Sequence, residues 1–219
     1  LAFRAHEIKA LLAQNYNQSI SDEEAKELVN ETEGWITGLL LSAETMWQGM
    51  ADRVRVARVS GINLYDYLAQ QVLNQQPANI RDFLLRTSLL EEFDEDLCQS
   101  VLGNPQNGVS WSHLIAAVLR SNLFVQPVGN RGTWLRYHHL FRDFLQDQLK
   151  TEQPGEELRI LYRLVNVYTE QEDWEKAYAI SQRLGDDEIK AKLIEQASPK
   201  LARSGRMKKL GEWLDDLPE

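Results

Sequence analysis

Two adjacent histidines, His138 and His139, are the residues of this chain whose type and position most directly suggest chemistry. They follow a short stretch of alternating polarity and precede a segment with helical spacing, so they lie where a strand gives way to a helix. The first backbone N–H groups of a helix attract anions, and an imidazole there adds a donor for a phosphate oxygen. The structural alternative is that one histidine caps the helix or packs against Trp134.

Other kinds of chemistry find little support in the residues. Adjacent histidines are expected to point apart, and no third ligand stands at a useful spacing, so no metal site is predicted. No Ser/His/Asp or Cys/His arrangement and no glycine-rich phosphate loop is present, so we predict no catalytic residues and no enzyme activity for this chain. The single cysteine, Cys98, excludes an internal disulfide and a Cys-rich zinc site. No run approaches 18 apolar residues, so no membrane span is expected.

Charge is distributed unevenly along the chain. The 219 residues include 24 Lys+Arg and 33 Asp+Glu, a net charge of −9, which argues against coating nucleic acid or an anionic membrane with the whole surface. Between Asp96 and Asp143, however, there is no acidic residue. Such a locally positive window suits the phosphates of DNA or of a nucleotide, although chance and a solvated face would give the same pattern. The window contains four arginines and three histidines: Arg120, Arg131, Arg136, Arg142, His113, His138 and His139.

The elements that position these residues begin with a helical domain over residues 1–51. Ser21 and Glu24 form a capping box, in which each satisfies a backbone N–H group of the other. The helical pattern breaks at Glu33–Gly34 and resumes at Trp35, which predicts three helices in all. Residues 52–63 are polar and irregular in period, so we interpret them as a connector.

Residues 64–150 have the element order of a winged-helix unit. After a run of helices the period changes, and residues 122–128 and 133–137 read as two strands joined by a tight turn at 129–132. Helical spacing returns at Leu140. An isolated hairpin is not stable, so this one must pack on the helices. The helices are expected from Leu64 to before Pro77, over Ile80–Thr87, after Asp94 and after Ser110.

Residues 151–219 read as the start of a tetratricopeptide-like array. A shift of 33 residues places Leu201 on Tyr168 and Gly205 on Glu172, close to the 34-residue repeat of such arrays. The predicted fold is therefore mainly α: a helical lid, a winged-helix unit with a small β-hairpin, and TPR-like helical hairpins. The aromatic residues of the last part either pack in its core or line a groove for a partner. The candidate groove residues are Trp174, Tyr178 and Trp213.

Four segments, in order along nearly the whole chain, resemble the STAND NTPases, in the branch of large MalT-like, LuxR-type ATP-dependent regulators. The four segments and the family patterns that they resemble are Thr32–Leu41 (TEGWPAGLxL), Gln75–Leu90 (QPxxxRxFLLRTSIL), Arg136–Leu145 (RYHHLFxxFL) and Gly211–Pro218 (the WLxxLP ending of an early repeat).

The resemblance implies a domain order: a P-loop ATPase core, a helical lid, a winged helix, a helical superhelix that senses an inducer and, in many members, a LuxR-type helix-turn-helix. It assigns 1–51 to the lid, 52–63 to the connector, 64–150 to the winged helix and 151–219 to the start of the superhelix. No Walker motif is present and the first residue is Leu1, so the chain is expected to be a piece of a longer protein that begins after the ATPase core.

The resemblance also implies a nucleotide site, with ATP or ADP and Mg²⁺ bound by the full-length protein and none expected on this chain alone. His138 aligns with the histidine of the MHD-like motif, which contacts the β-phosphate of ADP, and His139 replaces the Asp of that motif. Gly34, Trp35 and Ile36 match the GxP position near the adenine, with isoleucine in place of proline.

The implied partners are the upstream NTPase core in cis, an inducer or protein on the helical repeats, further copies of the protein on activation, and DNA through a separate C-terminal domain. The implied location is the cytoplasm.

Two other functions are compatible with the residues. A free-standing winged-helix module would contact DNA phosphates through Arg131, Arg136 and Arg142, and its binding would weaken steeply with salt. Its recognition helix, near 112–121, offers little for base readout. A TPR-like interaction scaffold would instead bind a partner through its aromatic groove.

Overall fold

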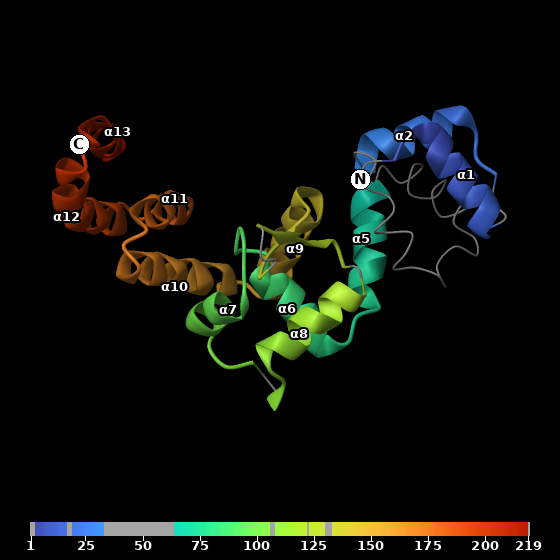
Figure 1. Cartoon of the computed structure of the whole chain (residues 1–219), viewed down its shortest axis with the longest axis horizontal. Helices are drawn as coiled ribbons and strands as arrows, with labels where there is room; N and C mark the ends of the chain where they lie inside the picture. The colour runs from blue at the N-terminus through green and yellow to red at the C-terminus, as the bar shows by residue number, and fades with distance from the viewer. Residues whose placement is uncertain are drawn as a thin grey trace. The chain divides into compact units, whose positions relative to one another are not determined.

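The structure is a computed structural model and describes residues 3–16, 19–32, 64–105, 108–121, 123–129 and 133–218. The chain forms two compact units, Leu1–Glu95 with Gln106–Gln148, and Asp96–Pro105 with Leu149–Glu219. Figure 1 shows the elements along the chain. Within the described ranges, no helix is long and apolar enough to cross a bilayer.

The first unit begins with helices α1 (Ala5–Tyr16) and α2 (Asp22–Thr32). The predicted capping box at the start of α2 is confirmed. The Ser21 N–H donates to Glu24 Oε2 at 2.8 Å, and the Glu24 N–H donates to Ser21 Oγ at 3.1 Å. The third helix expected in 1–51 and the connector 52–63 lie outside the described residues.

The winged-helix part of this unit contains α5 (Leu64–Asn74), α6 (Ala78–Thr87), α8 (Trp111–Arg120), β1 (Val125–Val128), β2 (Trp134–Tyr137) and α9 (His139–Glu152), whose last four residues belong to the second unit. The predicted hairpin is confirmed: β1 and β2 are antiparallel, with Val125 opposite Tyr137. The first strand is shorter than predicted because Phe124 has φ +56°, which interrupts the extended backbone. Phe93 adds a bridge that the sequence did not indicate, exchanging two backbone hydrogen bonds of 2.8 Å with Leu135.

An aromatic cluster holds the hairpin on the helices. The Tyr137 ring lies 5.1 Å from that of Phe93 and 6.1 Å from that of Phe141, measured between centroids. Its hydroxyl lies 2.7 Å from Thr87 Oγ1 on α6, so the buried phenol is hydrogen-bonded. This packing explains how a hairpin of two four-residue strands keeps a fixed position.

The second unit contains α7 (Glu95–Leu102), α10 (Glu156–Glu170), α11 (Trp174–Leu184), α12 (Asp187–Arg203) and α13 (Met207–Asp215), all but the first residue of α7 lying within it. The last four helices form two hairpins. The 33-residue repeat is visible in their turns, because Glu172 and Gly205 both have positive φ, +56° and +74°. The hydrogen bonds repeat as well, from Asp173 N to Tyr168 O and from Arg206 N to Leu201 O, each 2.9 Å. The predicted fold class is therefore confirmed.

Candidate functional site

The hairpin–helix junction places His138 between β2 and α9. Its N–H donates to Phe124 O at 2.9 Å, and its own carbonyl accepts the Arg142 N–H at 2.9 Å, in the manner of a residue preceding a helix. The side chain of His138 is half-buried. Because Phe124 holds a positive φ and is itself buried, with its ring 4.4 Å from that of Phe141, the position of His138 is set by packed neighbours on both sides.

The expectation that the two histidines point apart is wrong. The ring centroids of His138 and His139 are 4.5 Å apart at an interplanar angle of 34°. The turn into α9 brings the two side chains together, which alternation along a strand would not do. Among the residues that the structure describes, no group of three or more His, Cys, Asp or Glu side chains is arranged to hold a metal ion.

The other predicted contacts for phosphate or nucleotide are described only in part. Arg136 is exposed on β2, opposite Gln126 in the ladder. Arg142 is half-buried on α9, with its Nε 3.7 Å from Asp143 Oδ1. The remaining predicted residues, Arg131, Gly34, Trp35 and Ile36, lie outside the described residues.

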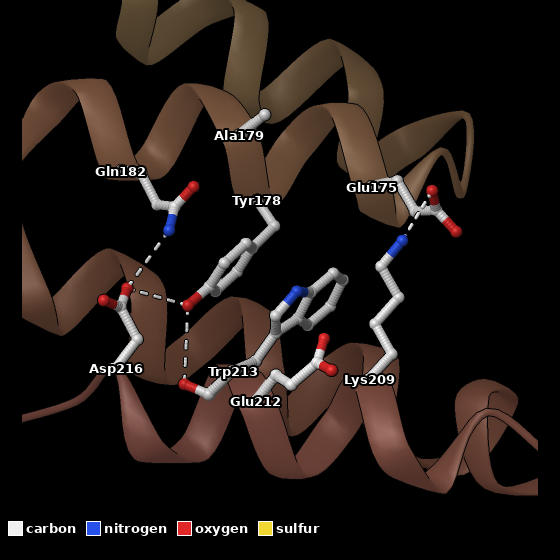
Figure 2. A pocket seen from close by; sticks show the side chains of 8 residues that line it. All are labelled: Glu175, Tyr178, Ala179, Gln182, Lys209, Glu212, Trp213 and Asp216. Atoms are coloured by element: carbon white, nitrogen blue, oxygen red, sulfur yellow. Dashed lines mark hydrogen bonds and ion pairs between the residues drawn. The ribbon is translucent and has the colours of Figure 1, made fainter.

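A second candidate site is a groove of about 400 Å³ between α11 and α13. Figure 2 shows its aromatic floor, where the Tyr178 and Trp213 rings stack with centroids 4.1 Å apart and an interplanar angle of 8°. Both side chains are about 5% exposed. The predicted third aromatic, Trp174, does not line this groove. It begins α11, half-buried, and its buried Nε1 donates no hydrogen bond to any residue that the structure describes.

Each end of the groove is closed by polar contacts, which Figure 2 shows. At one end Lys209 Nζ lies 2.7 Å from Glu175 Oε2. At the other end the Tyr178 hydroxyl donates to Asp216 Oδ2 at 2.8 Å, and Gln182 Nε2 donates to the same oxygen at 3.4 Å. The groove therefore combines a rigid apolar floor with fixed hydrogen-bonding groups, as small-molecule and peptide sites do.

These contacts shift the ionisation of the groove residues. Burial, and then the hydrogen bond to Asp216, raise the pKa of Tyr178. The hydrogen bonds from Tyr178 and Gln182 lower the pKa of Asp216, and the hydrogen bond from Lys209 lowers the pKa of Glu175. Near neutral pH the phenol is thus neutral and both carboxylates are charged.

The sequence reading missed the polar residues of the groove, Glu175, Gln182, Lys209 and Asp216. Glu175 and Lys209, like Gln182 and Asp216, are 34 residues apart, one more than the 33-residue repeat, and face each other across the groove. The aromatic residues Tyr178 and Trp213 are nearly in the same relation.

Comparison with known proteins shows which proteins this chain is similar to. Residues 69–157 match the family described as the MalT winged helix domain. The structure resembles that of a Signal Transduction ATPase with Numerous Domains (STAND) with a tetratricopeptide repeat sensor, from Pyrococcus horikoshii. That match has a TM-score of 0.57 and 17% identity, and it covers 98% of this chain and 31% of the other. The fold of this chain thus resembles part of the fold of that protein.

Curated proteins with similar sequences identify the kind of regulator that this chain resembles. The HTH-type transcriptional regulator MalT of Klebsiella pneumoniae strain 342 is 33% identical over 156 residues, which are 69% of this chain and 17% of that protein. MalT of Vibrio cholerae is 25% identical over 221 residues, 99% of this chain and 24% of that protein. Residues 69–157 are therefore similar to the winged helix domain of MalT, and the chain spans about a fifth of the length of these relatives.

Proposed function

We propose that this chain is the regulatory part of an ATP-dependent, MalT-like transcriptional regulator. In this proposal residues 1–51 are the lid, 64–150 the winged helix and 151–219 the first repeats of the sensor. The lid and the winged helix gate the exchange of ADP for ATP on an upstream P-loop core. An inducer or protein partner on the repeats biases that switch, and activation leads to self-association and to DNA binding through a separate domain.

The observation that carries the proposal is the place of His138. A half-buried imidazole immediately before α9 stands beside backbone N–H groups that have no intrahelical partner. The backbone of His138 is fixed by its bond to Phe124 O, which suits a residue that contacts a nucleotide phosphate in one packing and loses it in another. In this proposal His138 donates a hydrogen bond to the β-phosphate of ADP and stabilises the resting packing.

The groove between α11 and α13 supports the sensing part of the proposal. Its stacked floor of Tyr178 and Trp213 is rigid, and Gln182 and Glu212 stand at its walls. A ligand would gain contact with the aromatic edges and with polar groups without reordering the helices. The same groove is the surface through which the chain would act if it served only as an interaction scaffold.

The DNA-binding alternative has weaker support in the described residues. Of its three arginines, Arg142 already lies 3.7 Å from the Asp143 carboxylate and is half-buried. On α8, the exposed side chains are Ser112, His113, Leu119 and Arg120, and Arg120 is the one bidentate donor among them. These offer few of the bidentate donors that read bases in the major groove.

The nucleotide role of His138 is tested by ADP binding to the regulator extended upstream to its NTPase core. His138→Ala should weaken ADP binding by about tenfold or more, since a hydrogen bond to a charged group is lost. It should also raise basal transcription, because the resting packing is less stable. His138→Gln, which keeps a donor, should recover part of the affinity.

His113→Ala is the matched control, because His113 is an exposed histidine of the same unit on α8. Its ADP affinity should equal that of the unmodified protein. An unchanged dissociation constant for His138→Ala, in a variant whose circular dichroism spectrum is native, would contradict the proposed contact.

A further inference from the structure

In sequence, helix α7 lies within the winged-helix part of the chain. By its contacts, it belongs to the second unit. The match to the MalT winged helix domain, residues 69–157, includes α7. By contact, however, residues 96–105 form a unit with residues 149–219, which contain the repeats. The chain passes from the first unit into α7 after Glu95 and returns to the first unit after Pro105. Covalent connections thus tie both ends of α7 to the winged helix.

A directed hydrogen bond fastens α7 to the first repeat. Arg163 of α10 donates from Nη1 to Val101 O, in the last turn of α7, at 3.2 Å. The last carbonyls of a helix lack intrahelical partners and carry partial negative charge, so a guanidinium is well matched to this place. Gly103, with φ +77°, ends the helix there, and its N–H donates to the Gln99 carbonyl. A Cβ at Gly103 would lie 3.9 Å from Arg163 Nη1, so the turn and the guanidinium are close neighbours.

The apolar face of α7 does not provide the same precision. Leu97, Cys98, Val101 and Leu102 are all at most 4% exposed. Apolar burial is non-directional, so it fixes the exact position of a short helix less sharply than a hydrogen bond does. A hydrogen bond at 3.2 Å with a charged donor fixes the position of one end of the helix.

We propose that Arg163 is a positioning residue that makes α7 follow the first repeat, so that α7 is the element through which the repeats act on the winged helix. This inference rests on the proposed function, in which a ligand on the repeats biases the winged helix. A displacement of α10 then carries α7 with it, and the segments on either side of α7 convey that displacement to the first unit. Without the bond, α7 opens independently of the repeats.

The test is amide hydrogen exchange of the 219-residue chain, followed by mass spectrometry of peptides that cover 96–105. Leu164→Ala, which removes a side chain of α10 that is 1% exposed, lowers the stability of the repeats. If α7 opens together with the repeats, this variant should speed exchange in 96–105 by about tenfold or more. In the Arg163→Met background α7 should already exchange faster, by about tenfold, and Leu164→Ala should add nothing further.

Arg159→Met is the matched control. Arg159 is another arginine of α10, and its guanidinium donates to Glu156 of the same helix at 2.7 and 2.5 Å. Exchange in 96–105 should be unchanged in this variant. The inference is overturned if Leu164→Ala loosens α10 while 96–105 exchanges as before, or if the effects of Arg163→Met and Leu164→Ala simply multiply. Because no nucleotide is present in this experiment, its outcome is independent of the role of His138, and either proposal can fail alone.

Discussion

The turns of the two helical hairpins make the same backbone hydrogen bonds, although their residues differ in how well they suit each position of the turn. In the α10–α11 turn the residue with positive φ is Glu172, whereas in the α12–α13 turn it is Gly205. The following residue, Asp173, caps α11 by accepting the Lys176 N–H at 3.4 Å, but its counterpart Arg206 gives α13 no side-chain cap. Each turn thus has one favourable and one unfavourable residue.

This difference shows that the packing of the repeat sets the turn and that local preference is secondary. A non-glycine residue in the left-handed region costs about 1 to 2 kcal/mol, yet Glu172 adopts that region in the same hydrogen-bonded turn as Gly205. Ion pairs between the repeats accompany the unfavourable choices. Lys200 pairs with Glu172, and Arg206 Nη1 lies 2.7 Å from Glu175 Oε1. Exposed pairs of this kind contribute little each.

The largest effect is expected when Gly205 of the α12–α13 turn is replaced by glutamate, the residue at the corresponding position of the α10–α11 turn. Gly205→Glu should lower the stability of the α12–α13 hairpin by about 1 to 2 kcal/mol, because Glu must adopt φ near +74°. Apart from the adjacent residues, no atom of the described chain lies within 4 Å of where the new Cβ would stand, so the cost is conformational and not a clash. Hydrogen exchange of peptides from α12 and α13 measures this locally.

The reciprocal change, Glu172→Gly, serves as the control for this prediction. It should raise the stability of the α10–α11 hairpin by a smaller amount, since glycine also gains freedom in the unfolded chain. If Gly205→Glu leaves exchange in α12 and α13 unchanged, the two turns do not differ in strain and the comparison fails.

A smaller effect is expected at the helix caps. Asp173→Ala should lower the stability of the first hairpin by about 1 kcal/mol, because the Lys176 N–H loses its acceptor. Asp173→Asn keeps an acceptor and should change little. Exchange of the first amides of α11 reports the difference.

The corresponding position of the second hairpin sharpens the test. Arg206→Ala removes no cap, and so it should cost less than Asp173→Ala even though it also removes the ion pair to Glu175. An equal loss at both positions would show that the ion pair of Arg206 replaces the cap.

The sequence was sufficient for features that depend on local patterns. The capping box of Ser21 and Glu24, the hairpin before His138 and the 33-residue repeat all follow from residue types at fixed spacing. It was insufficient where tertiary contacts decide. The short first strand depends on Phe124, whose positive φ goes with a buried ring and a bond to His138.

The sequence predicted the aromatic residues of the candidate groove, but it did not predict the polar residues at the ends of the groove. Tyr178 and Trp213 were identified by type, while Asp216 and Gln182 gain their roles only when α13 lies beside α11. The nucleotide, DNA and partner assignments stay predictions, as do the domain boundaries of the lid and connector. His138 now has a defined position, although its ligand is still a proposal.

The smallest effect concerns two Tyr–Asp pairs of the repeats. The Tyr178 hydroxyl donates to Asp216 at 2.8 Å from a buried position, and the Tyr162 hydroxyl donates to Asp186 at 3.0 Å from a side chain that is 41% exposed. In both, the hydrogen bonds lower the pKa of the carboxyl group. For Asp186, however, the backbone N–H of Ile189 is the larger cause.

Tyr178→Phe should therefore raise the pKa of Asp216 towards its ordinary value, and Tyr162→Phe should move that of Asp186 less. A carboxyl group whose pKa is lower in the folded state stabilises the fold above its unfolded pKa of about 3.9, and this contribution is lost as the pH falls through the folded value. The acid side of the stability profile should accordingly flatten in Asp216→Asn and in Tyr178→Phe. Titration of the carboxyl ¹³C shifts by NMR measures both groups in one experiment. Equal shifts for the two tyrosine variants would show that burial of Tyr178 adds nothing to its bond with Asp216.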